Sequence, residues 1–218
     1  MTGWHDAVAE GFCFLVSVCL VLAVCKDDQD SAQMNEMNQM IETTGAHAPG
    51  PVSQLVFRTP KPKDGVAVWR SARAVGRLEL NTAYFYLVFC SDFQRTCVLA
   101  EDGDSIAGFV IGYQPPDESD TAFCWQIGVL PRWRGQGLGK RLLGAWLDLP
   151  SNRSVRWLTA TVADDNQGSD ALFKSFASSL GVPCTISPHF VRDHFPAGHR
   201  PEPLYRIGPI TGDARSRI

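Results

Sequence analysis

The stretch 132-RWRGQGLGKRLLGAW-146 decides the fold of this chain. Three glycines stand at alternate positions, Gly135, Gly137 and Gly139, with basic residues on both sides, and an apolar helical pattern begins at Leu138. Glycines at the start of a helix leave backbone N–H groups and the positive end of the helix dipole open to an anion. The stretch therefore predicts a loop that holds a diphosphate at the N-terminus of a helix.

Two familiar nucleotide-binding patterns do not fit this loop. The pattern G-x-x-x-x-G-K-[ST] fails because the residue five after Gly135 is Lys140 and the next is Arg141, which has no hydroxyl. The dinucleotide pattern G-x-G-x-x-G fails because position 140 is lysine, and it usually follows an early strand. The pattern that remains is R-x-x-G-x-G, formed by Arg134, Gly137 and Gly139. Taken alone, it is also compatible with a glycine-rich turn that carries a surface arginine.

Strand and helix patterns alternate on both sides of the loop. The expected strands are 54–60, the two arms of a hairpin within 96–116 that turns at Asp102-Gly103, 121–131, 155–163, 183–190 and 203–210. The expected helices are 65–76, capped by Asp64, then 78–93, 138–147, and 169–181, closed by Gly181. This order, with no internal repeat, predicts one mixed α/β domain.

Composition excludes several classes of protein. The chain has 218 residues, 44% of them hydrophobic, which suits one domain with a substantial core. Its formal net charge is −3, with acidic and basic residues interspersed, so no basic block predicts nucleic-acid binding.

The seven cysteines form neither a disulfide framework nor a metal site. They are scattered through apolar stretches, without C-x-x-C or a cysteine–histidine cluster of zinc spacing. We therefore expect no metal, and buried thiols in a reducing compartment, which predicts a cytoplasmic location.

The first fifty-three residues read as an extension to the domain. The apolar run from Phe12 to Cys25 is 14 residues long, about 21 Å as a helix, whereas a bilayer core is about 30 Å thick. No lysine or arginine precedes it, as a secretory signal would require. Residues 26–53 are polar and predict a disordered linker. The alternatives are a membrane anchor, which length and flanks disfavour, a dispensable apolar helix, and a start codon assigned too early.

The loop and the strand before it, 125-WQIGVLPRW-133, resemble the signature of the GNAT N-acetyltransferases, which holds the pyrophosphate of acetyl-CoA. The resemblance implies a domain over residues 54–210, with a mixed central sheet of about six or seven strands and flanking helices, and a C-terminal tail over 211–218. It implies acetyl-CoA as co-substrate. The residues implied to bind it are Val129, Arg134, Gly135, Gln136, Gly137, Leu138, Gly139, Lys140, Asn166 and Lys174.

A second motif, 164-DDNQGSDALFKSFA-177, resembles a later segment of the same family. There an asparagine bonds the pantetheine arm, which implies that role for Asn166, and Lys174 is placed to meet phosphates. The tyrosine that protonates the departing thiolate in the family falls at Phe173, and a phenyl ring cannot do this. Two further departures are Thr159, where the family often has glutamate, and Asp164, where proline is common.

Several other stretches are similar to one branch of this family, the L-2,4-diaminobutyrate N4-acetyltransferases of ectoine synthesis. They are 78-LELNTAYFYLVFCSDFQRTCVLAE-101, 120-DTAFCWQIGV-129, 158-LTATVADDNQGSDALF-173 and 198-GHRPEPLYRIGPI-210. The resemblance covers residues 57–210 and implies L-2,4-diaminobutyrate as the acceptor. It also implies a homodimer in which the C-terminal segment completes the neighbouring subunit's site.

A diamino acid needs acidic groups and an aromatic face to hold its ammonium groups. The residues implied to bind it are Glu79, Asn81, Tyr84, Trp125, His199 and Glu202. Of these, Tyr84, His199 and Glu202 are the expected catalytic residues, with Tyr84 or water supplying a proton to the thiolate. Glu202, Glu79 or His199 would end a water relay that takes the amine proton, and a backbone N–H near Val129 would meet the oxyanion.

Each of these residues also has an ordinary structural interpretation. Tyr84 and Trp125 could be core aromatics, Glu79 and Glu202 surface acids, and His199 a loop residue. Two other functions stay open as well: acetyl transfer to another small amine or polyamine, and a non-catalytic acyl-CoA-binding module tethered through residues 12–25. Neither predicts contact with nucleic acid, and we expect none with a membrane in the main interpretation.

Overall fold

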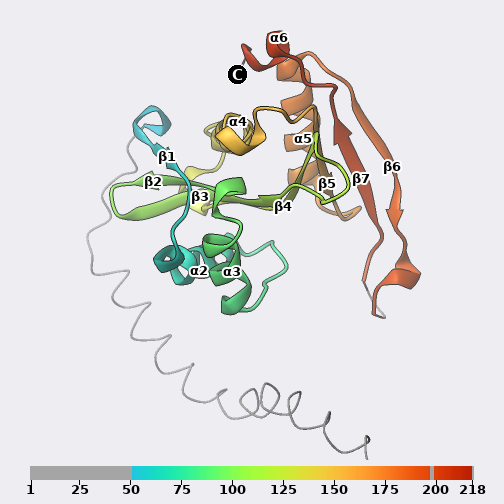
Figure 1. Cartoon of the computed structure of the whole chain (residues 1–218). Helices are drawn as coiled ribbons and strands as arrows, with labels where there is room; N and C mark the ends of the chain where they lie inside the picture. The colour runs from blue at the N-terminus through green and yellow to red at the C-terminus, as the bar shows by residue number, and fades with distance from the viewer. Residues whose placement is uncertain (1–50, 197–198, 218) are drawn as a thin grey trace, which may run out of the picture. The chain divides into compact units, whose positions relative to one another are not determined.

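The computed structural model describes residues 51–196 and 199–217, in which seven strands form one mixed sheet of order β1-β2-β3-β4-β5-β7-β6 (Figure 1). The strands are β1 (Val56–Arg58), β2 (Val98–Asp102), β3 (Ser105–Tyr113), β4 (Thr121–Val129), β5 (Trp157–Thr161), β6 (Cys184–Phe190) and β7 (Glu202–Ile207). The helices are α2 (Gly65–Val75), α3 (Ala83–Ser91), α4 (Leu138–Leu147), α5 (Gln167–Leu180) and α6 (Gly212–Arg215). This confirms the predicted fold class and the predicted order of strands and helices. The short apolar run and most of the linker predicted over residues 1–53 lie outside the described residues.

The strands pair antiparallel except for β4 and β5, which run parallel. A parallel pair needs a crossover connection, and α4 lies within it, directly after the glycine loop. The β2–β3 hairpin turns at Gly103-Asp104, between the paired residues Asp102 and Ser105, one residue later than predicted. Gly103 has a φ of 57°, a conformation that favours glycine in a two-residue hairpin loop.

Two hydrophobic clusters lie against opposite faces of the sheet. One joins α2 and α3 to residues of β2 and β3 such as Leu99, Phe109 and Ile111. The other joins α4 and α5 to the sheet through residues such as Trp146 and Phe176. Figure 1 shows α2 and α3 on one side of the strands and α4 on the other. The sheet is therefore covered on both faces, as in other α/β folds with helices on both sides.

The prediction that Asp64 caps α2 is wrong. Asp64 directly precedes α2, but its carboxylate makes no capping hydrogen bond to that helix. Instead it accepts hydrogen bonds from the Arg58 guanidinium at 2.6 Å and from the backbone N–H of Lys61 at 2.7 Å. Arg58 also donates to both carboxylate oxygens of Glu101, at 2.7 and 2.5 Å. In the bond to Arg58 both partners are ionised, whereas a capping bond would have a neutral donor, so the arginine of β1 holds this carboxylate.

The predicted tail over 211–218 contains the short helix α6, which packs on the domain. Ala214 is buried in the α4–α5 cluster. The Arg215 guanidinium donates to the carbonyl oxygens of Leu147, Asn152 and Val155, at 2.7 to 2.9 Å. Leu147 is the last residue of α4 and the other two residues follow it, so the C-terminal segment holds the end of that helix.

Candidate active site

The glycine loop leaves the start of α4 open. Gly135 and Gly137 have φ values of 73° and 79°, which side chains other than glycine rarely adopt. Gly137 is the N-cap of α4, and no side chain caps the helix there. A Cβ at either position would meet no atom of the described chain within 4 Å. The loop therefore presents backbone N–H groups and the helix dipole to an outside anion, as predicted for a diphosphate.

The third glycine of the loop has a different function. A Cβ at Gly139 would lie 3.0 Å from Cδ1 of Leu172 on α5. Gly139 therefore allows α4 and α5 to approach each other closely.

Arg134 fastens the loop to the sheet and to α2. Its Nε donates to the carbonyl of Val129 at 3.2 Å, and an Nη atom donates to the carbonyl of Val75 at 2.6 Å. Trp133, which directly precedes Arg134, is fully buried and anchors this end of the loop. The Gln136 side chain bonds back to the carbonyl of Arg132 at 3.0 Å. In the described residues, the guanidinium of Arg134 thus donates to backbone carbonyls. The donors that the loop leaves for a ligand are its backbone N–H groups.

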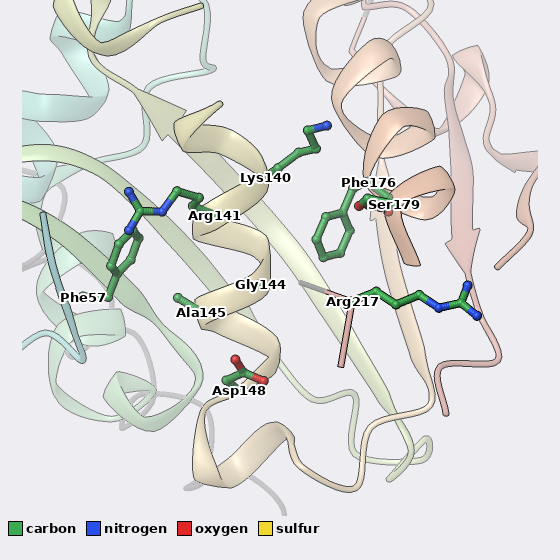
Figure 2. A pocket seen from close by; sticks show the side chains of 9 residues that line it. All are labelled: Phe57, Lys140, Arg141, Gly144, Ala145, Asp148, Phe176, Ser179 and Arg217. Atoms are coloured by element: carbon green, nitrogen blue, oxygen red, sulfur yellow. Dashed lines mark hydrogen bonds between the residues drawn. The ribbon is translucent and has the colours of Figure 1, made fainter. Parts of the chain in front are cut away.

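Two lysines were predicted to meet phosphates, and the structure gives them different surroundings. Lys140 makes no hydrogen bond or ion pair with another described residue and projects toward the α5 side of α4 (Figure 2). Lys174 forms an ion pair with Asp170, one turn earlier on α5, at 2.7 Å. That bond, together with one from Tyr205, lowers the pKa of Asp170. Burial and the bond to Asp170 raise the pKa of Tyr205 to about 12. Lys174 is therefore partly neutralised, whereas Lys140 is free.

A cavity of about 370 Å³ lies over the outer face of α4 (Figure 2). Phe57 and Phe176 stand at its two sides, and Lys140, Arg141 and Arg217 are the cations along it. The guanidinium of Arg141 lies 5.1 Å above the Phe57 ring and donates to the carbonyl of Val52. The residues predicted for the acceptor do not line this cavity.

Strands β4 and β5 separate after a short paired segment. Only Thr121, Ala122 and Phe123 of β4 pair with β5, at Trp157, Leu158 and Thr159. Beyond them a cleft of about 70 Å³ opens between the strands and the start of α5. Its lining residues are Leu78, Cys124, Trp125, Gln126, Ile127, Ala160, Thr161, Asn166, Ser169 and Phe173. Asn166 caps α5, where its side-chain oxygen accepts the Ser169 N–H at 3.1 Å.

A bulge in β4 turns two successive side chains to the same face. Ile111 of β3 pairs with Gln126 and Gly112 pairs with Cys124, so Trp125 has no partner on β3. Such a bulge shifts the alternation by one residue. Trp125 and Gln126 both contact residues of α3, whereas Cys124 and Ile127 pack with the α4–α5 cluster. Trp125 is 47% exposed, with Phe85, Phe89, Tyr113 and Phe123 around its ring.

Gln126 and Tyr86 are functional candidates that sequence reasoning missed. The Tyr86 hydroxyl donates to Oε1 of Gln126 at 3.0 Å, and Nε2 of Gln126 donates to the carbonyl of Glu79 at 2.7 Å. Burial raises the pKa of Tyr86, although interactions with Asn81 and Gln126 oppose the shift. This chain of bonds fixes the segment that carries Glu79 and Asn81 against β4. A single polar residue in an otherwise apolar strand was the signal for Gln126.

Three of the predicted acceptor residues converge. Nε2 of His199 lies 3.8 Å from a carboxylate oxygen of Glu79 and 4.0 Å from one of Glu202. The imidazole stacks on Phe195, with ring centroids 3.8 Å apart. The other oxygen of Glu202 accepts the Thr161 hydroxyl at 2.6 Å, and Thr161 lines the cleft. An imidazole and two carboxylates therefore stand beside the cleft, all from one chain.

The remaining predicted residues are placed less centrally. Tyr84 is 73% exposed on the first turn of α3, and the structure does not bring it to the cleft lining. Asn81 is half-buried just before α3. Val129 is the last residue of β4, where the strand meets the glycine loop. Thr159 is buried with its hydroxyl 3.5 Å from the carbonyl of Ala122, and Asp164 is exposed.

In residues 51–196 and 199–217, no group of three or more histidine, cysteine, aspartate or glutamate side chains is arranged so that it could hold a metal ion. Over the same ranges, the helices are too short or too polar to cross a membrane.

Comparison with known proteins agrees with this geometry. Residues 66–177 match the model of the acetyltransferase (GNAT) family. An L-2,4-diaminobutyric acid acetyltransferase of Marinococcus halophilus is 39% identical over 172 residues, 78% of this chain and 99% of its own length. One of Streptomyces coelicolor is 40% identical over 162 residues, 73% of this chain and 95% of its own.

A solved structure is similar over the same region. It is the diaminobutyrate acetyltransferase EctA from Paenibacillus lautus, in complex with its substrate L-2,4-diaminobutyric acid and coenzyme A. It is 34% identical, has a TM-score of 0.70, and covers 73% of this chain and 97% of its own.

Proposed function

This chain belongs to the acetyltransferase (GNAT) family, and we propose that it transfers the acetyl group of acetyl-CoA to the 4-amino group of L-2,4-diaminobutyrate, a step of ectoine synthesis. Its relatives of 39% and 40% identity are L-2,4-diaminobutyric acid acetyltransferases, and this chain covers at least 95% of their length. The observation that carries the proposal is the convergence of Glu79, His199 and Glu202 beside the cleft between β4 and β5.

The donor site fits the phosphates of acetyl-CoA. The open backbone N–H groups at the start of α4, with no side chain at Gly135 or Gly137, allow a pyrophosphate to approach the helix dipole. Lys140 supplies an uncommitted positive charge on the first turn of the same helix. The cleft then leads the acyl arm between the two strands, next to the capping residue Asn166.

The acceptor site suits a small molecule with two ammonium groups. Glu79 and Glu202 provide negative charge, and the exposed face of Trp125 attracts a cation. A site that holds the α-ammonium group fixes the far end of the substrate and leaves the 4-amine as the only nucleophile within reach of the thioester. Positioning of this kind is enough to explain why the 4-amine reacts and the α-amine does not.

The attacking amine must first lose a proton. An alkyl amine has a pKa of about 10, so most of it is charged at neutral pH. The cluster of Glu79, His199 and Glu202 offers acceptors for that proton, and Thr161 links Glu202 to the cleft. The neutral amine then attacks the thioester carbonyl and the C–N bond forms. The C–S bond breaks with its electron pair on sulfur, and nitrogen gives up a second proton as it becomes the amide, which balances the proton taken up by sulfur.

The experiment is thiol release from acetyl-CoA with a panel of amines. L-2,4-diaminobutyrate should be turned over with a far higher kcat/KM than spermidine, lysine or an N-terminal peptide amine. Rapid turnover of one of those amines and none of diaminobutyrate would overturn the substrate assignment. Binding of acetyl-CoA without any turnover would favour a non-catalytic acyl-CoA-binding module.

A homodimer in the cytoplasm is part of the proposal. The edge strand β6 and the residue after it carry exposed apolar side chains, Ile186, Phe190 and Val191, which a second subunit could cover. His199 and Glu202 come after β6 in the sequence and lie beside Glu79 of the same chain. Sedimentation across concentrations tests the dimer. Mixing the Trp125→Ala and His199→Ala proteins, at a diaminobutyrate concentration well below the KM of Trp125→Ala, tests whether the segment acts across subunits, since activity above the sum of the two variants requires a shared site.

A further inference from the structure

One face of α5 lines the cleft in which the thioester must break. Asn166, Ser169 and Phe173 follow one another at the spacing of one helical face, and all three line the cleft. The group expelled by the reaction is a thiolate, which gains from a hydrogen-bond donor as charge develops on sulfur. Phe173, 2% exposed, has no proton to give.

Several other polar side chains of the cleft are already engaged. Thr161 donates its hydroxyl to Glu202 at 2.6 Å, and Gln126 donates its amide to the carbonyl of Glu79 at 2.7 Å. The side-chain oxygen of Asn166 is held in the helix cap, which leaves its amide nitrogen next to the acyl arm. Burial raises the pKa of the Cys124 thiol, so it is a poor proton source.

Ser169 supplies the unengaged hydroxyl of this lining. Its backbone N–H donates to Asn166, which fixes the residue, but its hydroxyl bonds to no other described residue. It stands on the third residue of α5, where the positive end of the helix dipole also favours negative charge. The hydroxyl is therefore a donor that is positioned but unused.

We propose that the Ser169 hydroxyl donates a hydrogen bond to the sulfur of the departing thiolate, taking the place of a donor at position 173. The first amine proton goes to the acidic cluster, and the electron pair of the C–S bond stays on sulfur. The second proton, which nitrogen loses as it becomes the amide, passes through water to the thiolate as coenzyme A leaves. This inference rests on the proposed function and assigns Ser169 as a catalytic residue of that reaction.

The test is Ser169→Ala, measured beside Ser169→Thr and Ser175→Ala. The capping bond of Ser169 uses its backbone, so Ser169→Ala keeps the helix cap. We expect kcat to fall about tenfold, a smaller loss than removal of an oxyanion donor causes, with little change in either KM. Ser169→Thr keeps a hydroxyl and should retain most of the activity, and Ser175→Ala, exposed on the same helix, should match the unmodified chain.

A second readout separates this role from a structural one. The ultraviolet absorbance of the thiolate reports the ionisation of bound coenzyme A, and its titration should move to higher pH in Ser169→Ala. A kcat within about twofold of the unmodified chain, together with an unmoved titration, would overturn the proposal. If the unmodified chain does not acetylate diaminobutyrate at all, the proposed function fails instead, and the titration of bound coenzyme A still tests Ser169.

Discussion

The Tyr86 hydroxyl donates to the side-chain oxygen of Gln126 at 3.0 Å, and this bond joins α3 to the bulge of β4. Tyr86→Phe should lower the free energy of unfolding by about 1–2 kcal/mol, because a buried acceptor loses its partner. It should also raise the KM for the amine, because Gln126 holds the carbonyl of Glu79. Denaturant unfolding and steady-state kinetics measure the two effects. Tyr84→Phe is the stability control, since Tyr84 is exposed, and equal losses in both variants would contradict the prediction.

Trp125 should affect the binding of the amine substrate and not the binding of acetyl-CoA. Trp125→Ala should raise the KM for diaminobutyrate by about tenfold, the size of a partly desolvated cation–π contact, with acetyl-CoA binding nearly intact. Trp125→Phe should have a KM for diaminobutyrate between that of Trp125→Ala and that of the unmodified chain. An unchanged amine KM in the alanine variant would make Trp125 part of the aromatic packing only.

Backbone conformation should control acetyl-CoA binding at the glycine loop. Gly137→Ala should cost about 1–2 kcal/mol of stability, because its φ is 79°, and should raise the KM for acetyl-CoA. Gly103→Ala is the matched control, since Gly103 also has a positive φ and open space around it but lies in the β2–β3 hairpin. It should lose similar stability with no change in that KM. The same KM rise in both variants would show a general effect of unfolding.

The two lysines predicted to meet phosphates should differ. Lys140→Ala should raise the KM for acetyl-CoA several-fold, and added salt should shrink the difference, because an exposed charge is screened. Lys174→Ala should have the smaller effect, since Asp170 already pairs with its ammonium group at 2.7 Å. Isothermal titration with coenzyme A at two salt concentrations measures both. A larger loss for Lys174 would reverse this order.

Asp64 should make stability depend on acid. Burial acts to raise the pKa of Asp64, but bonds from Arg58 and from the Lys61 backbone outweigh it, so the pKa lies below its usual range. A lowered pKa gives stability that is present above the unfolded value of about 3.9 and is lost as the pH falls below it. Asp64→Asn should therefore cost about 2 kcal/mol near neutrality, and the cost should shrink steadily as the pH falls below about 4 and passes through the folded-state pKa. Denaturant midpoints measure the cost, and Asp104→Asn in the exposed hairpin loop is the control. A cost that did not change with pH would contradict the prediction.

The fold followed from local patterns in the sequence. The glycine loop, the apolar face of α4 and the hairpin signal are all short-range features, and the order of elements was predicted from them. The partner of Asp64 was not, because Arg58 and Glu101 come from β1 and β2 and meet it only in the folded chain. The pairing of Lys174 with Asp170, by contrast, is an i, i+4 pair that the sequence alone could have indicated.

The acceptor site depended on residues far apart in the chain. Glu79, His199 and Glu202 were singled out by resemblance, and only the folded chain shows that they stand together. Gln126 was missed because strict alternation along a strand would place its side chain on the other face of the sheet from Trp125. The bulge that brings both to one face leaves no reliable local pattern in the sequence.

Strand β5 contacts β4 on one side and β7 on the other. Thr161, its last residue, therefore lines the donor cleft and also holds Glu202 of β7. An alteration of β5 that accommodates a different acyl chain would move Glu202, the carboxylate proposed to face the amine. Donor and acceptor preference in this protein are thus tied to a single strand, so redesigning one without compensating the other should fail.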